Sequence, residues 1–345
     1  MSSSRKLLRK IAAYFVLCLL SAGTVLPLLW MLATSVKVPQ PQYLFPVRWL
    51  PKEPEVVKVH GDLRPVFMLD DEKVTIVRHS PEGDLVSPVS GGKERIVSPA
   101  RLKPVELTRF HWHNYLDAWR KIKIPLVFGR FRNVDGFLIF YINSLIVSIA
   151  ITVGQVFTSS LAAFAFARLR FRGRDHIFLA YIATLMVPTV VTMIPLFCLF
   201  RIFRLTDSYA ALILPGLFSA YGTFMLRQFF ISLPTELEEA AIVDGAGPWQ
   251  IYWKILLPLS KPALAALAIF VFLHSWNDFM WPLIVISRLS LKTLPIGLSY
   301  FQDYYTTDWQ LLMAGSVIVL IPVLIVFLVG QRFFIRGIVL SGIKG

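Results

Sequence analysis

Apolar residues occur in six long stretches that are almost free of charge, and polar residues gather between these stretches. The stretches are Ile11–Val36, Gly136–Ala167, His176–Phe200, Ser208–Leu226, Pro262–Ser287 and Trp309–Gln331. Because a helix needs about 20 residues to cross the hydrocarbon core of a bilayer, each stretch is long enough for one span. The pattern therefore predicts an all-α polytopic membrane protein with six transmembrane helices. A β-barrel would show short alternating segments instead.

Composition and charge support this interpretation. The chain is 56% hydrophobic and only 16% charged, whereas a soluble domain carries about 25% charged residues. The basic run SSSRKLLRK precedes the first stretch as in a signal peptide, but the apolar run continues well beyond a typical signal sequence, so we expect an uncleaved helix. The net charge of +14 lies mostly at the ends of the spans and in one long loop. Nucleic acid is therefore a poor candidate partner.

The distribution of Lys and Arg predicts the orientation in the membrane. With residues 1–10 inside, the short cytoplasmic pieces hold 14 basic residues and the short outer pieces hold four. We therefore expect both termini in the cytoplasm, a first span over 11–36, an extracytoplasmic loop over 37–135 and a core transmembrane domain over 136–345. The turn ARLRFRGRD after the second span suits an orientation signal or a contact with anionic membrane lipid.

The long loop changes character after a proline-rich start. Residues 53–107 contain short β-prone runs separated by turn signals such as PEGD and SGG, which predict a small β-rich extracytoplasmic insert; a disordered loop is the alternative. A short surface helix is expected in FHWHNYLDAWRKI. His111 and His113 lack a third ligand nearby and the two cysteines, Cys18 and Cys198, lie in apolar stretches. We therefore expect no metal site and no disulfide.

The segment TELEEAAIVDGAGPWQIYWKILLP, residues 235–258, is polar and helix-coded between two apolar stretches. Thr235 with Glu238 three residues later predicts a capping box, and Gly245 or Gly247 suits a left-handed turn. Pro248 suits the first turn of a second helix, which Pro258 is expected to break. Two capped helices exceed what a connector needs. Their small residues predict a cytoplasmic docking element for a soluble partner.

The same segment resembles the EAA loop of ABC-importer permeases. The matching positions are Glu239, Ala240, Ala241, Asp244, Gly245, Ile255, Leu257 and Pro258. The stretches YINSLIVSIAITVGQVFTSSLAAFAFARLRFRGRD, HSWNDFMWPLIVI and RFFIRGIVLSGIKG are similar to carbohydrate permeases of the MalG-like subfamily. Residues 51–109 depart from the compact pattern of that subfamily.

The resemblance implies a type I importer fold in a bacterial inner membrane and a transport role. It also implies a second homologous permease, an ABC ATPase dimer that docks on the EAA loop, and an extracytoplasmic solute-binding protein. The phosphate-binding motif G-x-x-x-x-G-K-[ST] does not occur in the sequence. We therefore expect no cofactor and no enzyme activity in this chain, with ATP and Mg²⁺ bound by the partner ATPase.

Candidate residues for the solute pathway are polar or aromatic groups in the apolar stretches. They are Tyr221, Gln228, Trp276, Asn277, Asp278 and Trp281, with Thr189 and Thr192 as further candidates. An acid such as Asp278 inside a span is a functional candidate by default, although a position near a wet outer vestibule explains it equally well. The tryptophans could stack on sugar rings, or the motif WNDFMWP could serve packing or gating shared by the family.

Three alternatives stay open from the sequence. An ABC permease for a glycerol-phosphate ester or a polyol would share the same motifs. A secondary transporter would need no ATPase, but it predicts paired intramembrane charges or related broken helices. The third is a membrane scaffold whose outer β-rich insert is the working part.

Overall fold

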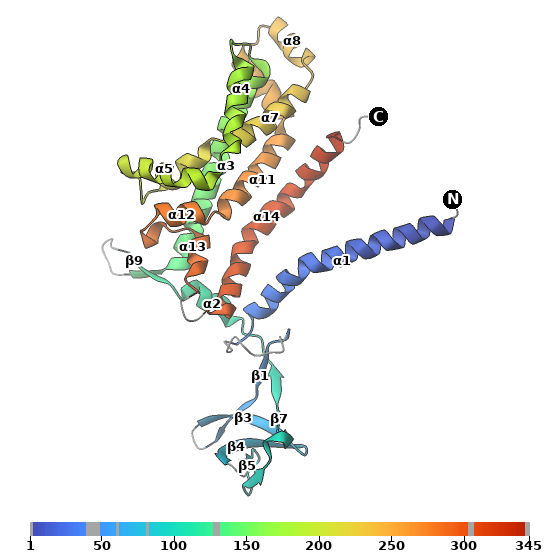
Figure 1. The fold of residues 1–345 in the computed structure, drawn as a ribbon, viewed down its shortest axis with the longest axis vertical. Helices are drawn as coiled ribbons and strands as arrows, with labels where there is room; N and C mark the ends of the chain where they lie inside the picture. The colour runs from blue at the N-terminus through green and yellow to red at the C-terminus, as the bar shows by residue number, and fades with distance from the viewer. Residues whose placement is uncertain are drawn as a thin grey trace. The chain divides into compact units, whose positions relative to one another are not determined.

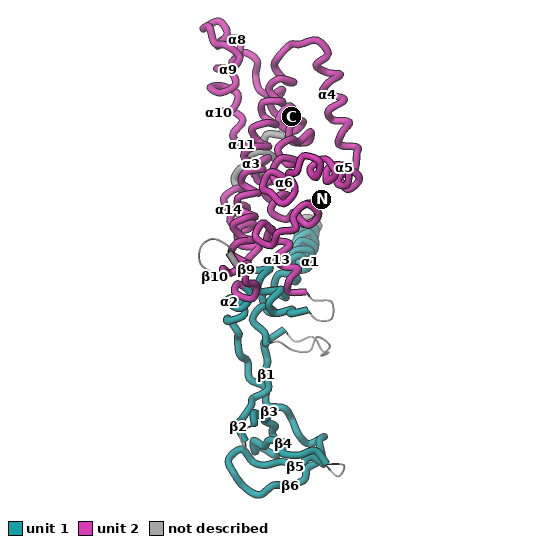
Figure 2. The backbone as a smooth tube through the Cα atoms, turned by 90° about the vertical axis from the view of Figure 1, so that its left-hand side faces the viewer, with its two compact units in different colours: residues 1–118, 306–317 teal, residues 119–305, 318–345 magenta. Residues whose placement is uncertain are grey.

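The computed structural model describes residues 3–38, 49–59, 62–80, 83–126, 132–302 and 307–341. These residues form two compact units, which Figure 2 colours teal and magenta. Unit 1 comprises Met1–Ala118 and Thr306–Val317, and unit 2 comprises Trp119–Tyr305 and Ile318–Gly345. Two helices, α2 (His113–Arg120) and α14 (Trp309–Ser341), contribute residues to both units.

Unit 1 begins with the long helix α1 (Ser3–Ser35) and continues into short strands (Figure 1). The strands are β1 (Lys52–Pro54), β2 (Val56–Val59), β3 (Asp62–Leu69), β4 (Glu72–Ser80), β5 (Gly83–Pro88), β6 (Arg95–Val97), β7 (Lys103–Pro104) and β8 (Glu106–Thr108). The Asn114 side chain of α2 donates to the carbonyls of Ser35 and Lys37, which fixes the end of α1.

The strands of unit 1 form an antiparallel sheet and a separate two-stranded stem. The sheet has the order β2-β3-β4-β5-β6, with β7 pairing with β3 as well. Its small core contains Leu69, Val74 and Val86. In the stem, β1 pairs with β8 so that Lys52 lies opposite Thr108 and Pro54 opposite Glu106. The two ends of the segment 55–105 are therefore adjacent at the end of the stem.

Unit 2 is built around the long helix α3 (Gly136–Arg168), against which α7, α11 and α13 pack (Figure 1). Its other helices are α4 (Arg174–Ala183), α5 (Thr189–Ile202), α6 (Tyr209–Ile213), α7 (Ala220–Ser232), α8 (Glu236–Val243), α9 (Pro248–Ile251), α10 (Leu257–Leu259), α11 (Lys261–Trp276), α12 (Met280–Val285) and α13 (Leu294–Ser299). A two-stranded ribbon, β9 (Lys123–Leu126) with β10 (Arg132–Asp135), precedes α3.

Polar side chains of α3 connect it to distant segments. The Asn143 amide donates to the carbonyls of Ser290 and Lys292, and its oxygen accepts from the hydroxyl of Tyr209 at 2.6 Å. The hydroxyl of Ser144 accepts from the backbone N–H of Leu294 at 2.8 Å. Since each group is paired inside an apolar helix bundle, these bonds position α6 and α13 against α3.

Four helical segments are long and apolar enough to cross a membrane, and two bent pairs raise the number to as many as six among the described residues. The predicted span over His176–Phe200 is not one straight helix: Arg174–Met186 and Thr189–Ile202 meet at 99°. Pro188 explains the break, because proline lacks a backbone N–H and excludes Val187 from the helical conformation. The predicted span Pro262–Ser287 also divides, into α11 and α12.

Candidate functional site

The segment from Thr235 to Pro258 forms two helical pieces joined by a tight turn at one end of unit 2 (Figure 1). Helix α8 ends in a Schellman motif: Ala246 N–H donates to the Ala241 carbonyl at 2.8 Å and Gly245 N–H to that of Ile242 at 2.9 Å. Gly245 has a φ of +83°, which confirms the left-handed turn expected at Gly245 or Gly247. The turn therefore has a defined geometry and is not a loose connector.

The predicted capping box at Thr235 is wrong. Thr235 has helical backbone angles and its side chain makes no capping bond, while its carbonyl accepts from the N–H groups of Glu238 and Glu239. The Glu238 carboxylate, the expected second half of the box, instead pairs with Nε of Arg168 at 2.8 Å. The second helical piece begins as expected, with Pro248 at its first position, and the Gln250 side chain accepts from Gly247 N–H at 3.1 Å.

Pro258 does not break the second helical piece where the sequence predicted. A π-helix over Tyr252–Leu256 comes before it, and the helical path continues to Leu259. In the π-helix, Leu257 N–H donates to the carbonyl of Tyr252, five residues back. The chain then bends by 77° between Leu259 and Lys261, directly after the helical piece that contains Pro258.

Buried side chains attach the second piece to α3. The Tyr252 ring is fully buried, packs on Phe164 with centroids 5.3 Å apart, and its hydroxyl shares a 2.7 Å hydrogen bond with that of Ser160. Ile251 and Leu256 belong to the same buried core. A movement of this segment must therefore move α3, or else break this packing.

Arg168, the last residue of α3, connects α8 to the spans. Besides its ion pair with Glu238, it donates to the carbonyls of Phe230 at 2.7 Å and Leu233 at 2.9 Å, at the end of α7. Burial raises the pKa of the Glu238 carboxyl, and the positive charge of Arg168 opposes that shift. One guanidinium thus joins three helices at the base of the segment.

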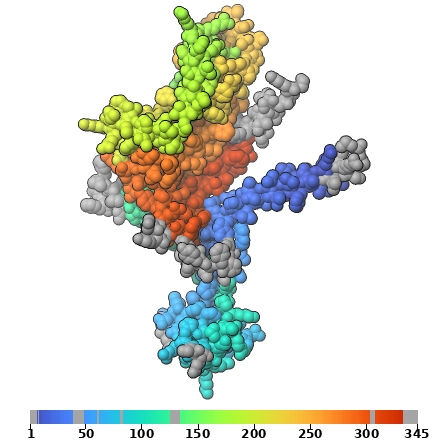
Figure 3. Space-filling model, viewed as in Figure 1, coloured from blue at the N-terminus to red at the C-terminus, as the bar shows by residue number. Residues whose placement is uncertain are grey.

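The outer face of the segment is apolar and exposed. Val243 is 85% exposed, and Leu237, Ile242 and Trp249 are also exposed. In the space-filling view, the segment near residue 240 (yellow) lies at the surface of unit 2 (Figure 3). Large exposed apolar side chains on a short ordered helix are typical of an interaction surface.

The structure separates the eight docking candidates into an outer and an inner set. Glu239, Ala240, Asp244, Gly245 and Pro258 are exposed, whereas Ala241, Ile255 and Leu257 are half-buried and pack against the core. The first set lies where a partner could contact it. The second holds the segment on the bundle.

The tryptophans among the pathway candidates lie in the packing. Trp276 is fully buried and donates its indole N–H to the carbonyl of Val319 at 3.2 Å, and Trp281 is buried and donates to that of Ala211 at 2.8 Å. Asn277 and Asp278 lie between α11 and α12, with Asp278 accepting from Trp281 N–H at 3.4 Å. These contacts match the packing alternative for WNDFMWP better than stacking on a solute.

Tyr221 and Gln228 are exposed and lie seven residues apart on α7, which places them on one face of that helix. Thr189 and Thr192 are exposed on α5, where the Thr192 hydroxyl donates to the carbonyl of Thr189. The structure therefore keeps Tyr221 and Gln228 accessible and does not bring them together with the buried tryptophans.

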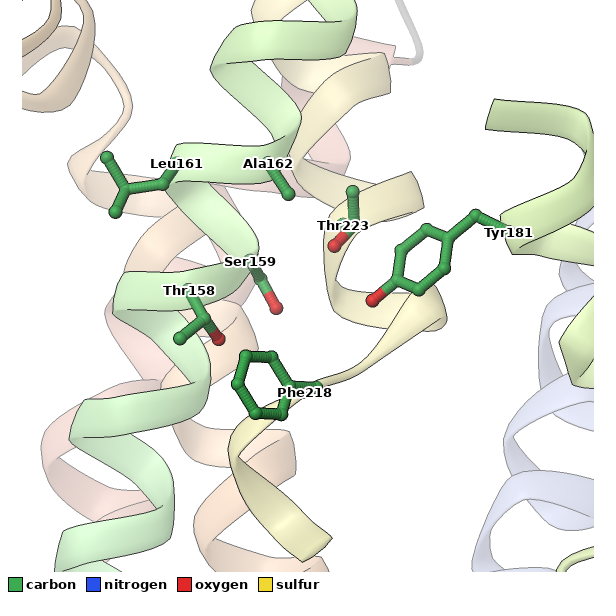
Figure 4. Close-up of a pocket in the computed structure, with 7 residues that line it drawn as sticks. All are labelled: Thr158, Ser159, Leu161, Ala162, Tyr181, Phe218 and Thr223. Carbon is green, nitrogen blue, oxygen red and sulfur yellow. The ribbon is translucent and has the colours of Figure 1, made fainter. Parts of the chain in front are cut away.

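Sequence reasoning missed a cavity of about 440 Å³ between α3, α4 and the start of α7. Its lining residues are Thr158, Ser159, Leu161, Ala162, Tyr181, Phe218 and Thr223 (Figure 4). The only signal in the sequence was the hydroxyl-rich run TSS in an apolar helix, which is usually helix packing. Within the described ranges, no group of three His, Cys, Asp or Glu side chains could hold a metal ion.

Comparisons with known proteins agree with these features. Residues 155–339 match the family described as "Binding-protein-dependent transport system inner membrane component". The arabinooligosaccharides transport system permease protein AraQ of Halalkalibacterium halodurans is 41% identical over 203 residues, 59% of this chain and 73% of AraQ. The sn-glycerol-3-phosphate transport system permease protein UgpE of Yersinia pestis bv. Antiqua is 38% identical over 230 residues, 66% of this chain and 79% of UgpE.

A solved structure shows the same fold. A chain of a bacterial ABC transporter involved in the import of the acidic polysaccharide alginate superposes with a TM-score of 0.67 at 20% identity, over 97% of this chain and 99% of that chain. The sequence matches, the apolar helices and this shared fold identify a multi-pass transport permease. The chain belongs to the family of binding-protein-dependent transport system inner membrane components.

Proposed function

We propose that this chain is a permease subunit of an ATP-driven importer for sugars or oligosaccharides, and that residues 235–258 form the surface on which a separate ATPase docks. The proposal rests on how this segment is folded and how it is attached to the spans. Its outer face is apolar and exposed, with Val243 85% exposed, while Tyr252 and Arg168 attach its inner face to the spans. A surface of this kind transmits a push from a soluble subunit to the membrane helices.

The proposed assembly contains this permease, a second homologous permease, two ATPase subunits in the cytoplasm and an extracytoplasmic solute-binding protein. Both termini lie in the cytoplasm, and the strands of residues 52–108 lie outside. ATP and Mg²⁺ bind to the ATPase. Family membership supports the binding protein and the inner membrane, and the resemblance to AraQ supports an oligosaccharide as solute.

A second solute class is supported by the UgpE relatives, whose name specifies sn-glycerol-3-phosphate. A phosphate ester needs cationic side chains along its path. Arg168 is committed to Glu238 and two carbonyls, and Arg227 contacts the carbonyl of Phe166 and the ring of Phe178. These two arginines are occupied by the fold, which favours an uncharged solute.

The docking proposal is tested with a matched pair of substitutions on α8. Glu239 and Glu236 are both exposed acids, but only Glu239 belongs to the EAA pattern. In proteoliposomes with the complete importer, Glu239→Ala and Val243→Asp should reduce ATP-dependent uptake by about tenfold or more, as expected for central interface positions. Glu236→Ala should leave uptake within about twofold of the wild type.

Co-purification of the ATPase separates docking from later steps, because the variants should lose the ATPase while the permease pair stays assembled. Normal uptake by Glu239→Ala and Val243→Asp would refute the docking surface. Uptake without any ATPase would refute the proposed mechanism as a whole.

A further inference from the structure

The cavity between α3, α4 and the start of α7 is lined by two residues whose hydroxyls have no hydrogen-bond partner among the described residues. Ser159 and Thr223 are each 1% exposed, and neither hydroxyl has a hydrogen-bond partner within the described structure. Both residues line the cavity, together with Tyr181 of α4 (Figure 4). Thr158 differs, because its hydroxyl donates to the carbonyls of Gln155 and Leu217.

The fold keeps space for this arrangement. A Cβ at Gly222 would lie 2.6 Å from the Ser159 hydroxyl oxygen, so only glycine at this position leaves that hydroxyl in place. The Tyr181 ring stacks on Phe166 of α3 with centroids 6.5 Å apart, which directs its hydroxyl toward the cavity. Phe218 forms the opposite wall with its ring. The cavity thus has a defined shape made by three elements.

The surroundings make the unpartnered hydroxyls informative. Ser159 and Thr223 lie in helical segments that are apolar and long enough to span a membrane. Hydrocarbon offers no hydrogen bonds, so a buried hydroxyl there is unfavourable unless a ligand or water pairs with it. The cavity volume of about 440 Å³ is far larger than the roughly 30 Å³ of one water molecule and lies within the range of small-molecule sites.

The chemistry of the lining selects a class of ligand. Hydroxyls of Ser159, Thr223 and Tyr181 can each donate and accept, whereas the Tyr181 and Phe218 rings offer apolar faces. A saccharide ring has the complementary pattern of hydroxyl edges and apolar C–H faces. None of the seven lining residues carries a charge, so nothing in the lining balances a phosphate or carboxylate.

We propose that this cavity is a solute-binding site for an uncharged saccharide, and that this subunit therefore contacts the transported solute directly. The inference rests on the proposed import function and extends it in two ways. It assigns the contact to Ser159, Thr223, Tyr181 and Phe218 rather than to the buried tryptophans of α11 and α12. It also excludes an anionic solute such as a glycerol-phosphate ester from this site.

Equilibrium binding to the complete membrane complex, without its binding protein, tests the proposal. The neutral probes are arabinotriose, xylotriose and maltotriose, and sn-glycerol 3-phosphate is the anionic comparison. Binding is measured by saturation-transfer NMR with the complex in nanodiscs. At least one neutral probe should bind. Ser159→Ala and Thr223→Val should each weaken its Kd by about three- to tenfold, the effect of one neutral hydrogen bond.

Ser148→Ala is the matched control. Ser148 is also a fully buried, unpartnered serine of α3, but it does not line the cavity. Its substitution should change Kd by less than about twofold. Because none of the three hydroxyls has a hydrogen-bond partner in the described part of the chain, no variant should lower the melting temperature of the solute-free complex by more than about 2 °C.

The outcomes separate this site from the transport function. Three results would each overturn the proposal. They are equal Kd values in all three variants, no binding of any neutral probe, and a structure of the probe-treated complex in which the cavity holds only water. ATP-dependent uptake is measured in parallel. If uptake persists in those cases, the import function stands and only this site fails; if uptake is absent as well, the proposed function fails with it.

Discussion

Gly245 has a left-handed φ of +83°, and a Cβ at this position would meet no atom of the described residues within 4 Å. Asparagine tolerates such a φ, whereas alanine loses about 1–2 kcal/mol there. We expect Gly245→Asn to insert and fold normally but to reduce ATPase co-purification and uptake, because the new side chain extends from the docking surface.

Gly247 supplies the control for Gly245. It is also exposed and unobstructed, but its φ is −79° and it caps α9, where asparagine is favourable. Gly247→Asn should therefore preserve folding, both in the isolated chain and in the complex with the ATPase. If Gly245→Asn supports normal uptake, Gly245 serves only the turn and not the docking contact.

The ion pair of Arg168 with Glu238 invites a double-mutant cycle. Arg168→Met removes the ion pair and two bonds to carbonyls, and should destabilise the chain by about 2–4 kcal/mol. Glu238→Gln removes only the negative charge and should cost less. Chemical denaturation in detergent measures both, and the double variant should be less destabilised than the sum of the two single variants. Strict additivity would show that the pair is not coupled.

The raised pKa of Glu238 predicts a pH dependence. Because burial favours the protonated carboxyl in the folded state, the wild type binds this proton more tightly when folded than when unfolded. Relative to Glu238→Gln, wild-type stability should be highest below the ordinary pKa of 4.5 and should fall as pH rises through the folded-state pKa. Melting temperatures of both proteins across this range check the sign. A difference that grows with pH in favour of the wild type would contradict it.

At the residue scale, the sequence predicted those backbone conformations that depend on one residue and its neighbours in the chain. The left-handed Gly245 and the first-turn Pro248 follow from their own backbone preferences, and both are found. The Glu238 half of the predicted capping box is absent because its carboxylate pairs with an arginine 70 positions earlier in the sequence. The sequence near Thr235 does not predict a contact with that arginine. The hydroxyls of Ser159 and Thr223 became informative only when the fold placed them beside one cavity.

At the element scale, hydropathy locates apolar stretches well but averages over their interruptions. The break at Pro188 has a visible cause, since proline ends a helix at the preceding residue. The break at residues 277–279 lies just before Pro282, which has no N–H for the Asp278 carbonyl, and the Asp278 side chain accepts from Trp281 N–H there. The buried indoles of Trp276 and Trp281 hold the two sides of the break, so packing and the proline together determine where it falls.

The attachment of α9 and the π-helix to α3 gives a prediction for a whole element. Tyr252→Phe removes the hydroxyl that bonds Ser160 but keeps the buried ring, so it should destabilise the chain by about 1 kcal/mol. If the segment transmits movement through this contact, uptake per ATP hydrolysed should fall further than stability explains. Trp253→Phe, at an exposed ring of the same element, is the control. Equal coupling ratios in both variants would assign the transmission elsewhere.

At the scale of the whole molecule, sequence and structure comparisons cover different parts of the chain. The AraQ and UgpE matches span 59% and 66% of it, whereas the structural match spans 97%. The structural match therefore covers a larger share of the chain than the two sequence matches, at 20% identity.

The stem of unit 1 allows these strands to be removed cleanly. Pro54 and Glu106 lie opposite each other in the β1–β8 pair, so replacing residues 55–105 by Asn-Gly should close a two-residue hairpin without altering the stem. We expect the shortened chain to insert, to assemble and to retain basal ATP hydrolysis with its partners, because the docking segment belongs to unit 2. Stimulation of ATP hydrolysis by the solute-loaded binding protein should be lost, because the proposal places these strands on the extracytoplasmic side, where that protein binds.

Two measurements on the same variant decide the role of the strands. Cysteine accessibility of the remaining loops reports whether the spans insert in the wild-type orientation, and ATP hydrolysis with and without the loaded binding protein reports the contact. Retained stimulation and normal uptake would make the strands dispensable for import. Loss of basal hydrolysis together with loss of insertion would assign them a role in folding, because the shortened chain would then lack the stability that residues 55–105 provide to unit 1.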